Sequence, residues 1–185
     1  MIRCLALFSL VAAATALPPR FVQDPAAAAP GAEHTQLTKL AGDWTVVTKF
    51  QFGPGGPAQE FQGKAHGKAI LGGRFVQFDE TAVEFGAAVE RQKTWGFNKQ
   101  SHKYEATWIY TGSTAVMQLV GEAQKDGKTI AGSASFAGDE GKAQDFTWTL
   151  AWIDADHFSS TLVAPAHGKG RSATFHAVYT RATAK

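Results

Sequence analysis

Gly42-Asp43-Trp44 begins the part of this chain that decides the fold, and Tyr179-Thr180-Arg181 ends it. From Trp44 onward apolar and polar residues alternate, as in Trp44-Thr45-Val46, and period two is typical of a β-strand with one buried face. If the strands between the two stretches close into a barrel, the first and last strands become neighbours. We therefore expect the Trp44 ring to form the barrel floor beside Gly42, with the Arg181 guanidinium stacked on its face.

About ten alternating segments follow one another, separated by short turn sequences such as Gly53-Pro54-Gly55-Gly56-Pro57 and Lys125-Asp126-Gly127-Lys128. Short connections between successive strands predict an antiparallel meander, and closure of the sheet removes its two exposed edges. Between Glu33 and Ala41, Leu37 and Leu40 share one helical face. The sequence thus predicts an all-β, up-and-down barrel over residues 32–185, closed at one end by a short helix. A two-sheet sandwich or a fully packed interior is the alternative.

The first 31 residues differ in composition from the rest. Met1-Ile2-Arg3 is a short positive start, an apolar run follows from Cys4 to Ala14, and Ala14-Thr15-Ala16 fits a cleavage site. This pattern predicts a signal peptide over residues 1–16 and an exported protein, periplasmic or secreted. The only cysteine lies within it, so the mature protein is expected to lack thiol chemistry. Residues 17–31 are rich in Pro and Ala and predict a disordered linker.

Composition argues against several classes of function. The formal net charge of the 185 residues is +2, and Lys and Arg do not cluster, so we expect neither a nucleic-acid partner nor stable membrane insertion. The Gly-x-Ser-x-Gly elbow, the His-Glu-x-x-His motif, cysteine pairs and phosphate loops are absent. We therefore expect no enzyme activity, no metal and no cofactor. The oligomeric state is left open.

Several motifs resemble a bacterial family of unknown function, DUF family 1579. They are Leu37 to Trp44, Ile70-Leu71-Gly72-Gly73-Arg74-Phe75-Val76-Gln77, Thr94-Trp95-Gly96-Phe97-Asn98, Tyr104-Glu105-Ala106-Thr107-Trp108-Ile109, and Tyr179-Thr180-Arg181. Two motifs depart from the family pattern: Gly96-Phe97-Asn98 stands in place of the usual Gly-Tyr-Asp, and Tyr110 replaces a frequent acidic residue after Trp108-Ile109. The resemblance covers the chain from Glu33 onward and implies a calycin-like barrel, the class of lipocalins and fatty-acid-binding proteins. It implies no established activity.

Inward-facing aromatic residues and one arginine are the candidate ligand-binding residues. Arg74 follows the Gly72-Gly73 turn, where it has either a binding role, meeting a ligand carboxylate, or a structural one, pinning the turn or pairing with Glu80 or Asp79. The tryptophans are either cavity walls or plain core. The candidate set is Arg74, Trp95, Tyr104, Trp108, Tyr110, Phe146, Trp148 and Tyr179. We expect an exported, non-enzymatic barrel that binds a small apolar or amphipathic molecule in its interior.

Two other functions are alternatives. A hydrolase or isomerase would use a carboxylate inside the cavity. Asp79 and Glu80 point to opposite faces of a strand, and we expect these carboxylates and Glu84 to be solvated outward charges. A haem-binding barrel would use a histidine such as His176, but His176 is out of phase with Phe175, Ala177 and Tyr179, so we expect it to face outward.

Overall fold

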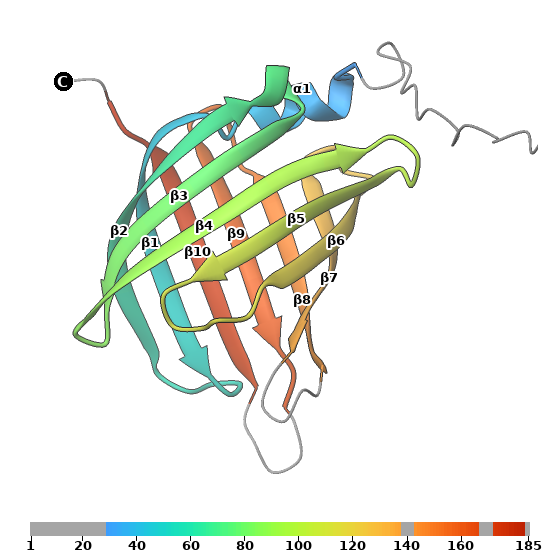
Figure 1. Ribbon diagram of the computed structural model, residues 1–185. Helices are drawn as coiled ribbons and strands as arrows, with labels where there is room; N and C mark the ends of the chain where they lie inside the picture. Colours follow the sequence, from blue (N-terminus) through green and yellow to red (C-terminus); the bar gives the residue numbers. More distant parts are fainter. Residues whose placement is uncertain (1–28, 138–142, 167–171, 184–185) are drawn as a thin grey trace, which may run out of the picture.

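The protein forms one closed antiparallel barrel capped by a short helix (Figure 1). The structure, a computed structural model, describes residues 29–137, 143–166 and 172–183. The elements are α1 (Ala32–Thr38), β1 (Gly42–Phe52), β2 (Ala58–Ile70), a 3-10 turn (Leu71–Gly73), β3 (Phe75–Glu84), β4 (Ala87–Asn98), β5 (Lys103–Tyr110), β6 (Met117–Ala123), β7 (Thr129–Ala137), β8 (Ala143–Trp152), β9 (His157–Ala164) and β10 (Ala173–Arg181). The predicted ten-strand meander is confirmed, and the sandwich is wrong.

Closure depends on the pairing of the first and last strands. β1 and β10 run antiparallel, with Trp44 opposite Arg181 at one end and Phe52 opposite Ala173 at the other. Every other strand pairs with its neighbours in the chain. We call the end of the barrel beside α1 the helix end and the opposite end the distal end (Figure 1).

The helix closes its end of the barrel by burying one face. His34 and Leu37 on α1 are buried, as is Leu40 just beyond it. The helix ends at Thr38 rather than at Ala41. The carbonyls of Lys39, Leu40 and Ala41 accept hydrogen bonds from the side chains of Arg181 and Trp44. Gly67 on β2 permits the close approach of this segment, since a Cβ there would lie 2.0 Å from the Leu40 carbonyl oxygen. The backbone after α1 therefore packs directly against β2.

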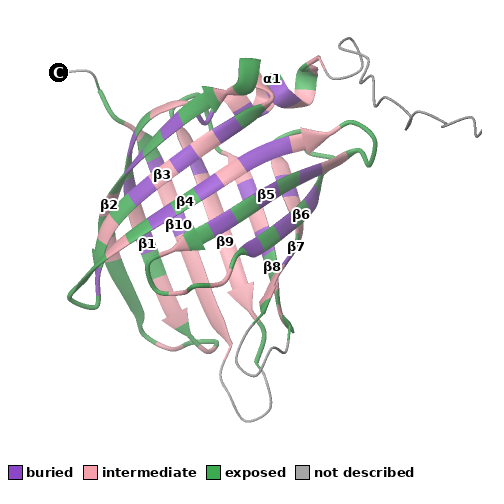
Figure 2. Ribbon diagram, in the orientation of Figure 1, coloured by how far each residue is buried: buried purple, intermediate pink, exposed green. Residues whose placement is uncertain are grey.

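Burial is uneven along the barrel axis. Figure 2 shows buried residues along the strands near α1, and intermediate exposure along the distal parts of β9, β10 and β1. The largest fully buried side chains include Tyr179, Leu37, Leu40, Ile130 and Leu150. The helix end thus holds the densest apolar packing, while the distal end is more accessible.

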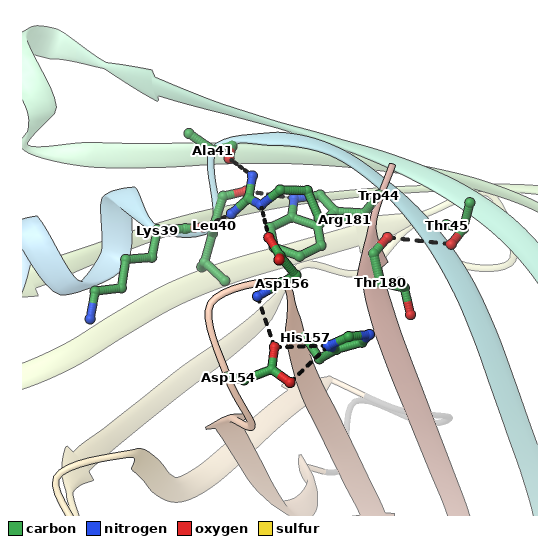
Figure 3. Close-up of polar contacts among 10 residues, drawn as sticks. All are labelled: Lys39, Leu40, Ala41, Trp44, Thr45, Asp154, Asp156, His157, Thr180 and Arg181. Atoms are coloured by element: carbon green, nitrogen blue, oxygen red, sulfur yellow. Dashed lines mark hydrogen bonds and ion pairs between the residues drawn. The ribbon is translucent and has the colours of Figure 1, made fainter. Parts of the chain in front are cut away.

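Trp44 and Arg181 meet at the helix end as the sequence predicts (Figure 3). The guanidinium carbon lies 4.2 Å from the centroid of the Trp44 ring, whose Nε1 donates to the Leu40 carbonyl at 2.9 Å. The Arg181 Nη1 and Nη2 atoms donate to the carbonyls of Ala41 at 3.0 Å and Lys39 at 3.2 Å. One side chain therefore covers the ring and satisfies carbonyls after α1.

Gly42 is required at this junction for two reasons. Its φ of 117° is one that other residues rarely adopt, and a Cβ there would lie 2.7 Å from Arg181 Nη1. The Gly42, Trp44 and Arg181 set is thus a single packing unit rather than three separate features.

The predicted signal peptide (1–16) and most of the predicted linker (17–31) lie outside the described residues. Within the described ranges, no helix has the length and apolar character needed to cross a membrane.

Replacing Arg181 with Lys is expected to destabilise the protein nearly as much as replacing it with Ala. Lysine keeps the charge but has neither the planar group that covers Trp44 nor the second nitrogen that reaches the Lys39 carbonyl. We expect each variant to lose about 1–3 kcal/mol in chemical unfolding, the range for a stacked cation with hydrogen bonds of its own. A Lys variant as stable as the wild type would contradict the stacking argument.

Candidate functional site

A layer of buried charged residues crosses the barrel interior between its two ends. We call Glu80, Glu84, Arg91, Lys93 and Tyr179 the charged layer. All are at least nine-tenths buried. They come from β3, β4 and β10, at the inward positions that continue the apolar rows of these strands. The alternation of the strands therefore carries charged side chains into the interior at fixed heights.

Arg91 is the centre of this layer. Its Nη1 donates to Glu80 Oε1 at 3.0 Å, and its Nη2 donates to Glu84 Oε2. The other oxygen of Glu80 accepts from the Tyr179 hydroxyl at 2.8 Å and lies 3.8 Å from Lys93 Nζ. Both oxygens of Glu80 are thus engaged, and the two cations are matched by two carboxylates.

Burial shifts two of these groups away from their charged forms. Loss of hydration lowers the pKa of Lys93, although Glu80 opposes this effect. Loss of hydration also raises the pKa of Tyr179 well above its usual value, and the neighbouring Glu80 adds to the shift. Tyr179 is therefore a neutral donor to Glu80 at physiological pH.

Two buried polar atoms in or beside the layer have no hydrogen-bond partner among the described residues. They are Glu84 Oε1 and Trp108 Nε1. The Trp108 ring lies 4.9 Å from Lys93 Nζ, and its centroid is 6.1 Å from that of Phe175. The Arg91 guanidinium, which holds Glu84, lies 5.0 Å from the same Phe175 ring. One acceptor, on Glu84, and one donor, on Trp108, are thus left free among the described contacts of these side chains.

The interior differs on the two sides of the layer. Toward the helix end, a cavity of about 10 Å³, measured as the space open to the centre of a water molecule, is lined by Phe78, Lys93, Trp95 and Tyr179 among others. This volume holds about one water molecule. Toward the distal end, half-buried or exposed aromatic side chains accumulate; these distal phenylalanines are Phe50, Phe52, Phe61, Phe85, Phe136, Phe146 and Phe175.

Comparison with known proteins identifies the family. A family model described as "Protein of unknown function (DUF1579)" matches residues 29–181. The chain belongs to this family. No protein of curated function shows significant sequence similarity to it.

One solved structure supports the barrel fold of this family member. The chain is similar to Rv2717c from M. tuberculosis, with a TM-score of 0.58 and 16% identity, over 84% of this chain and 100% of that one. A redesigned β-barrel matches at a TM-score of 0.43 and 9% identity, over 80% of this chain and 95% of that one. The likeness to Rv2717c shows the fold alone.

The candidate ligand-binding residues of this DUF1579 member do not form one site. Trp95 and Trp148 pack together at a ring distance of 5.4 Å, and Tyr104 packs on Phe97. Trp148 also donates to the Ser133 carbonyl at 2.9 Å. These three candidates, Trp95, Tyr104 and Trp148, are core residues on the helix side.

Other candidates lie beside the charged layer or beyond it. Trp108 and Tyr179 border it, Tyr110 lies opposite Arg91, and Phe146 stacks on Phe136 at 5.5 Å. Arg74 is elsewhere, because its Nη1 donates to the Leu71 carbonyl at 3.2 Å within the turn before β3. Of its two predicted roles, the structure supports the one that pins the turn.

The expectation that the strand-three carboxylates are solvated is wrong for Glu80 and Glu84. Asp79 does face outward, where Gln77 and Gln92 donate to it. Glu80 and Glu84 face inward because they share the parity of Val76 and Phe78. Sequence reasoning also missed Arg91 and Lys93, although both share the parity of Trp95. The general preference of charges for the surface outweighed this signal.

His176 faces outward, as its spacing predicts. It lies opposite Lys49 on β1, and its Nδ1 is 2.8 Å from the Thr161 hydroxyl. Burial and the nearby Lys49 lower its pKa. Among the described histidines, His34 is buried but takes a bond from the Gly31 amide at 3.0 Å. His167 lies outside the described residues. His176 therefore offers no ligand to a haem inside the barrel.

Replacing Arg91 with Met is expected to cost about 3–5 kcal/mol of unfolding free energy, because two buried carboxylates lose their main partner. A matched control is Lys49→Met on the outer face, which breaks the exposed 3.5 Å pair with Glu60. That change is expected to cost at most about 1 kcal/mol. Urea unfolding of both variants decides the point. Equal effects would show that the buried layer carries no special energetic weight.

Alkaline destabilisation is expected to depend on Tyr179. Above about pH 10 the unfolded chain releases the tyrosine proton, whereas the folded protein keeps it because the pKa of Tyr179 is raised. The folded state then binds more protons, so its stability falls as pH rises. In Tyr179→Phe the contribution of Tyr179 to this loss of stability is absent. Lys93, whose pKa is also shifted, is present in both proteins, so its contribution cancels in the comparison. The unfolding free energies of the wild type and of Tyr179→Phe are compared above about pH 10. If they change in parallel, the effect does not come from Tyr179.

Proposed function

We propose that this protein is an exported, non-enzymatic binding protein that holds a small amphipathic molecule in the distal half of its barrel. The observation that carries the proposal is the pair of unsatisfied atoms, Glu84 Oε1 and Trp108 Nε1, beside the charged layer. Buried polar groups are nearly always hydrogen-bonded, so an unpaired acceptor and donor together favour a missing partner. The proposed site is bounded by the charged layer and the distal phenylalanines.

The distal phenylalanines support an apolar body for this molecule. Phe50 packs on Phe52 and Phe85 at ring distances of 4.6 and 5.7 Å, and Phe61 packs on Phe85 at 4.7 Å. Phe52 and Phe85 are nevertheless 52% and 59% exposed. Large apolar surface that stays exposed at the end of a barrel is typical of a ligand-binding mouth.

The enzymatic alternative gains one observation, the buried Glu84 with a free oxygen. Acid–base catalysis needs a group that is free to exchange a proton with the substrate. Glu80 has both oxygens engaged, and Arg91 bonds both glutamates. This arrangement supports binding over proton transfer, and we keep the enzyme as the rival hypothesis.

Export is proposed from the N-terminal sequence alone. The positive start, the apolar run and the Ala14-Thr15-Ala16 site support it. The matching experiment measures the mass of the protein recovered from the periplasm or the medium. We expect a mass that corresponds to a new N-terminus near Leu17.

Binding is tested with N-phenyl-1-naphthylamine, a neutral probe whose fluorescence rises in apolar surroundings. We expect saturable binding and quenching of tryptophan emission by energy transfer. Trp108→Phe is expected to weaken binding of decan-1-ol, whose hydroxyl can accept a hydrogen bond, because the change removes the free donor. Trp152→Phe is the control, because Trp152 also has an unpaired Nε1 but lies in the β8 end near α1. Absence of saturable binding by this probe and by decan-1-ol would overturn the proposed function.

A further inference from the structure

Glu84 is the distal end of the charged layer. It is the last residue of β3, whereas Lys93 lies opposite Phe78, in the half of that strand nearer α1. Between them, Arg91 bonds one oxygen of Glu80 and one oxygen of Glu84. The layer is therefore ordered along the barrel axis, with the amine of Lys93 toward the helix end and the carboxylate of Glu84 toward the distal end.

The distal end of the layer is short of positive charge. The buried Asp, Glu, Lys and Arg side chains among the described residues are Glu80, Glu84, Arg91 and Lys93. In the described ion pairs, Glu84 contacts Arg91 and shares this cation with Glu80. Lys93 lies 3.8 Å from Glu80, and loss of hydration lowers its pKa, which favours its neutral form. One oxygen of Glu84 is thus left with neither a hydrogen bond among the described residues nor a cation of its own.

Phe61 is the aromatic neighbour of Glu84 across the sheet. Gly63 on β2 pairs with Ala82 on β3. Phe61 and Glu84 are each two residues further toward the distal end, and both have the inward parity of their strands. Side chains at matching heights on the same face of adjacent strands lie within reach of one another. The Phe61 ring therefore lies beside the carboxylate of Glu84.

Three more of the distal phenylalanines continue this aromatic wall. Phe85, directly after β3, has its ring 4.7 Å from that of Phe61 and 5.7 Å from that of Phe50. Phe50 lies opposite Phe175 in the β1–β10 ladder, and the Phe175 ring is 5.0 Å from the Arg91 guanidinium carbon. Because ring faces attract cations, a wall that already holds one positive charge also suits a second.

We propose that the barrel binds amphipathic amines, with the protonated amino group at Glu84 and the apolar chain among the distal phenylalanines. This inference rests on the proposed function and names its ligand class. A primary ammonium group has N–H donors and no acceptor, so it bonds the free Oε1 and supplies the missing positive charge. The carboxylate and the ring faces offset the hydration that the ammonium loses. A fatty-acid carboxylate has no proton to donate and is repelled by Glu84.

The test compares decylamine, decan-1-ol and decanoate by titration calorimetry at neutral pH, where the amine and the acid are both ionised. The apolar chains are nearly equal in length, so the head groups decide the differences. We expect decylamine to bind at least about tenfold more tightly than decan-1-ol, because a charge-assisted hydrogen bond is stronger than a neutral one. Decanoate is expected to bind more weakly than the alcohol, because Glu84 repels it.

The outcomes separate this inference from the proposed function. If decan-1-ol or decanoate binds as tightly as decylamine, the head-group inference fails while the proposed function stands. If neither decan-1-ol nor the naphthylamine probe binds, the proposed function fails, and the inference fails with it.

Glu84→Gln locates the amine site, because it removes the negative charge with little change in volume. We expect the preference for decylamine over decan-1-ol to fall by about tenfold. The matched control is Glu60→Gln, the same change toward the distal end of β2 but on the outer face, where Glu60 pairs with Lys49. The control is expected to keep the preference of the wild type. An unchanged preference in Glu84→Gln overturns the inference.

A second variant decides the point if Glu84→Gln does not fold. Phe61→Leu keeps an apolar side chain but removes the ring face beside the proposed ammonium position. We expect it to weaken decylamine binding about threefold more than decan-1-ol binding, the effect of one lost cation–π contact. Equal changes in the two affinities would show that no cation lies on this ring, and the inference would fail.

Discussion

Hydrogen bonding between the first and last strands is the constraint on which the rest of this structure depends. The β1–β10 ladder fixes Trp44 opposite Arg181, and this register sets the height of every inward side chain on the two strands. At the helix end the stacked pair also holds the segment after α1, so the ends of the barrel sequence and the cap are joined in one contact. A slip of one residue would turn Trp44 to solvent and bring its polar neighbours inside. The aromatic and charged side chains therefore enforce the register that closure requires.

The same alternation explains why charged residues lie inside the barrel. β3 and β4 pair Glu80 with Arg91 and Phe78 with Lys93, so carboxylate and cation arrive on adjacent strands at nearly the same height. Isolated, each charge would be too costly to bury. Together with the Tyr179 hydroxyl they satisfy one another, and one oxygen of Glu84 has no partner among the described residues. The layer is thus a chain of polar contacts that runs from Glu84 through Arg91 and Glu80 to Lys93.

Much of the fold was predictable from the sequence. Period two and short turns are local signals, and the Trp44–Arg181 pair at the two ends of the barrel sequence agrees with them. The interior polar site was less predictable. The parity of Glu80 with Phe78 and of Lys93 with Trp95 was readable in the chain, yet the strong tendency of charges to stay in water argued against it. Which inward aromatics are core and which border the layer was not readable at all. Trp148 and Trp108 belong to similar alternating strands, and they differ because Gly121 accommodates the Trp148 ring, where a Cβ would lie 2.6 Å away, whereas Trp108 faces Lys93.

The energetics of the charged layer connect the fold to function. An apolar core of the same volume is often as stable as a buried ion-pair network, or more stable by about 1–4 kcal/mol. Stability alone therefore does not account for four charges inside a small barrel whose helix end is already densely packed. Under the proposed binding function a preformed polar surface accounts for them, because side chains held by mutual bonds would present their free atoms to a ligand without further ordering. Arg91 fixes Glu84, and Lys93 contacts the Trp108 ring, so both free atoms are oriented before binding. The ion pairs of the layer thus offset the cost of burying its charges. The same contacts fix the positions of the free atoms on Glu84 and Trp108.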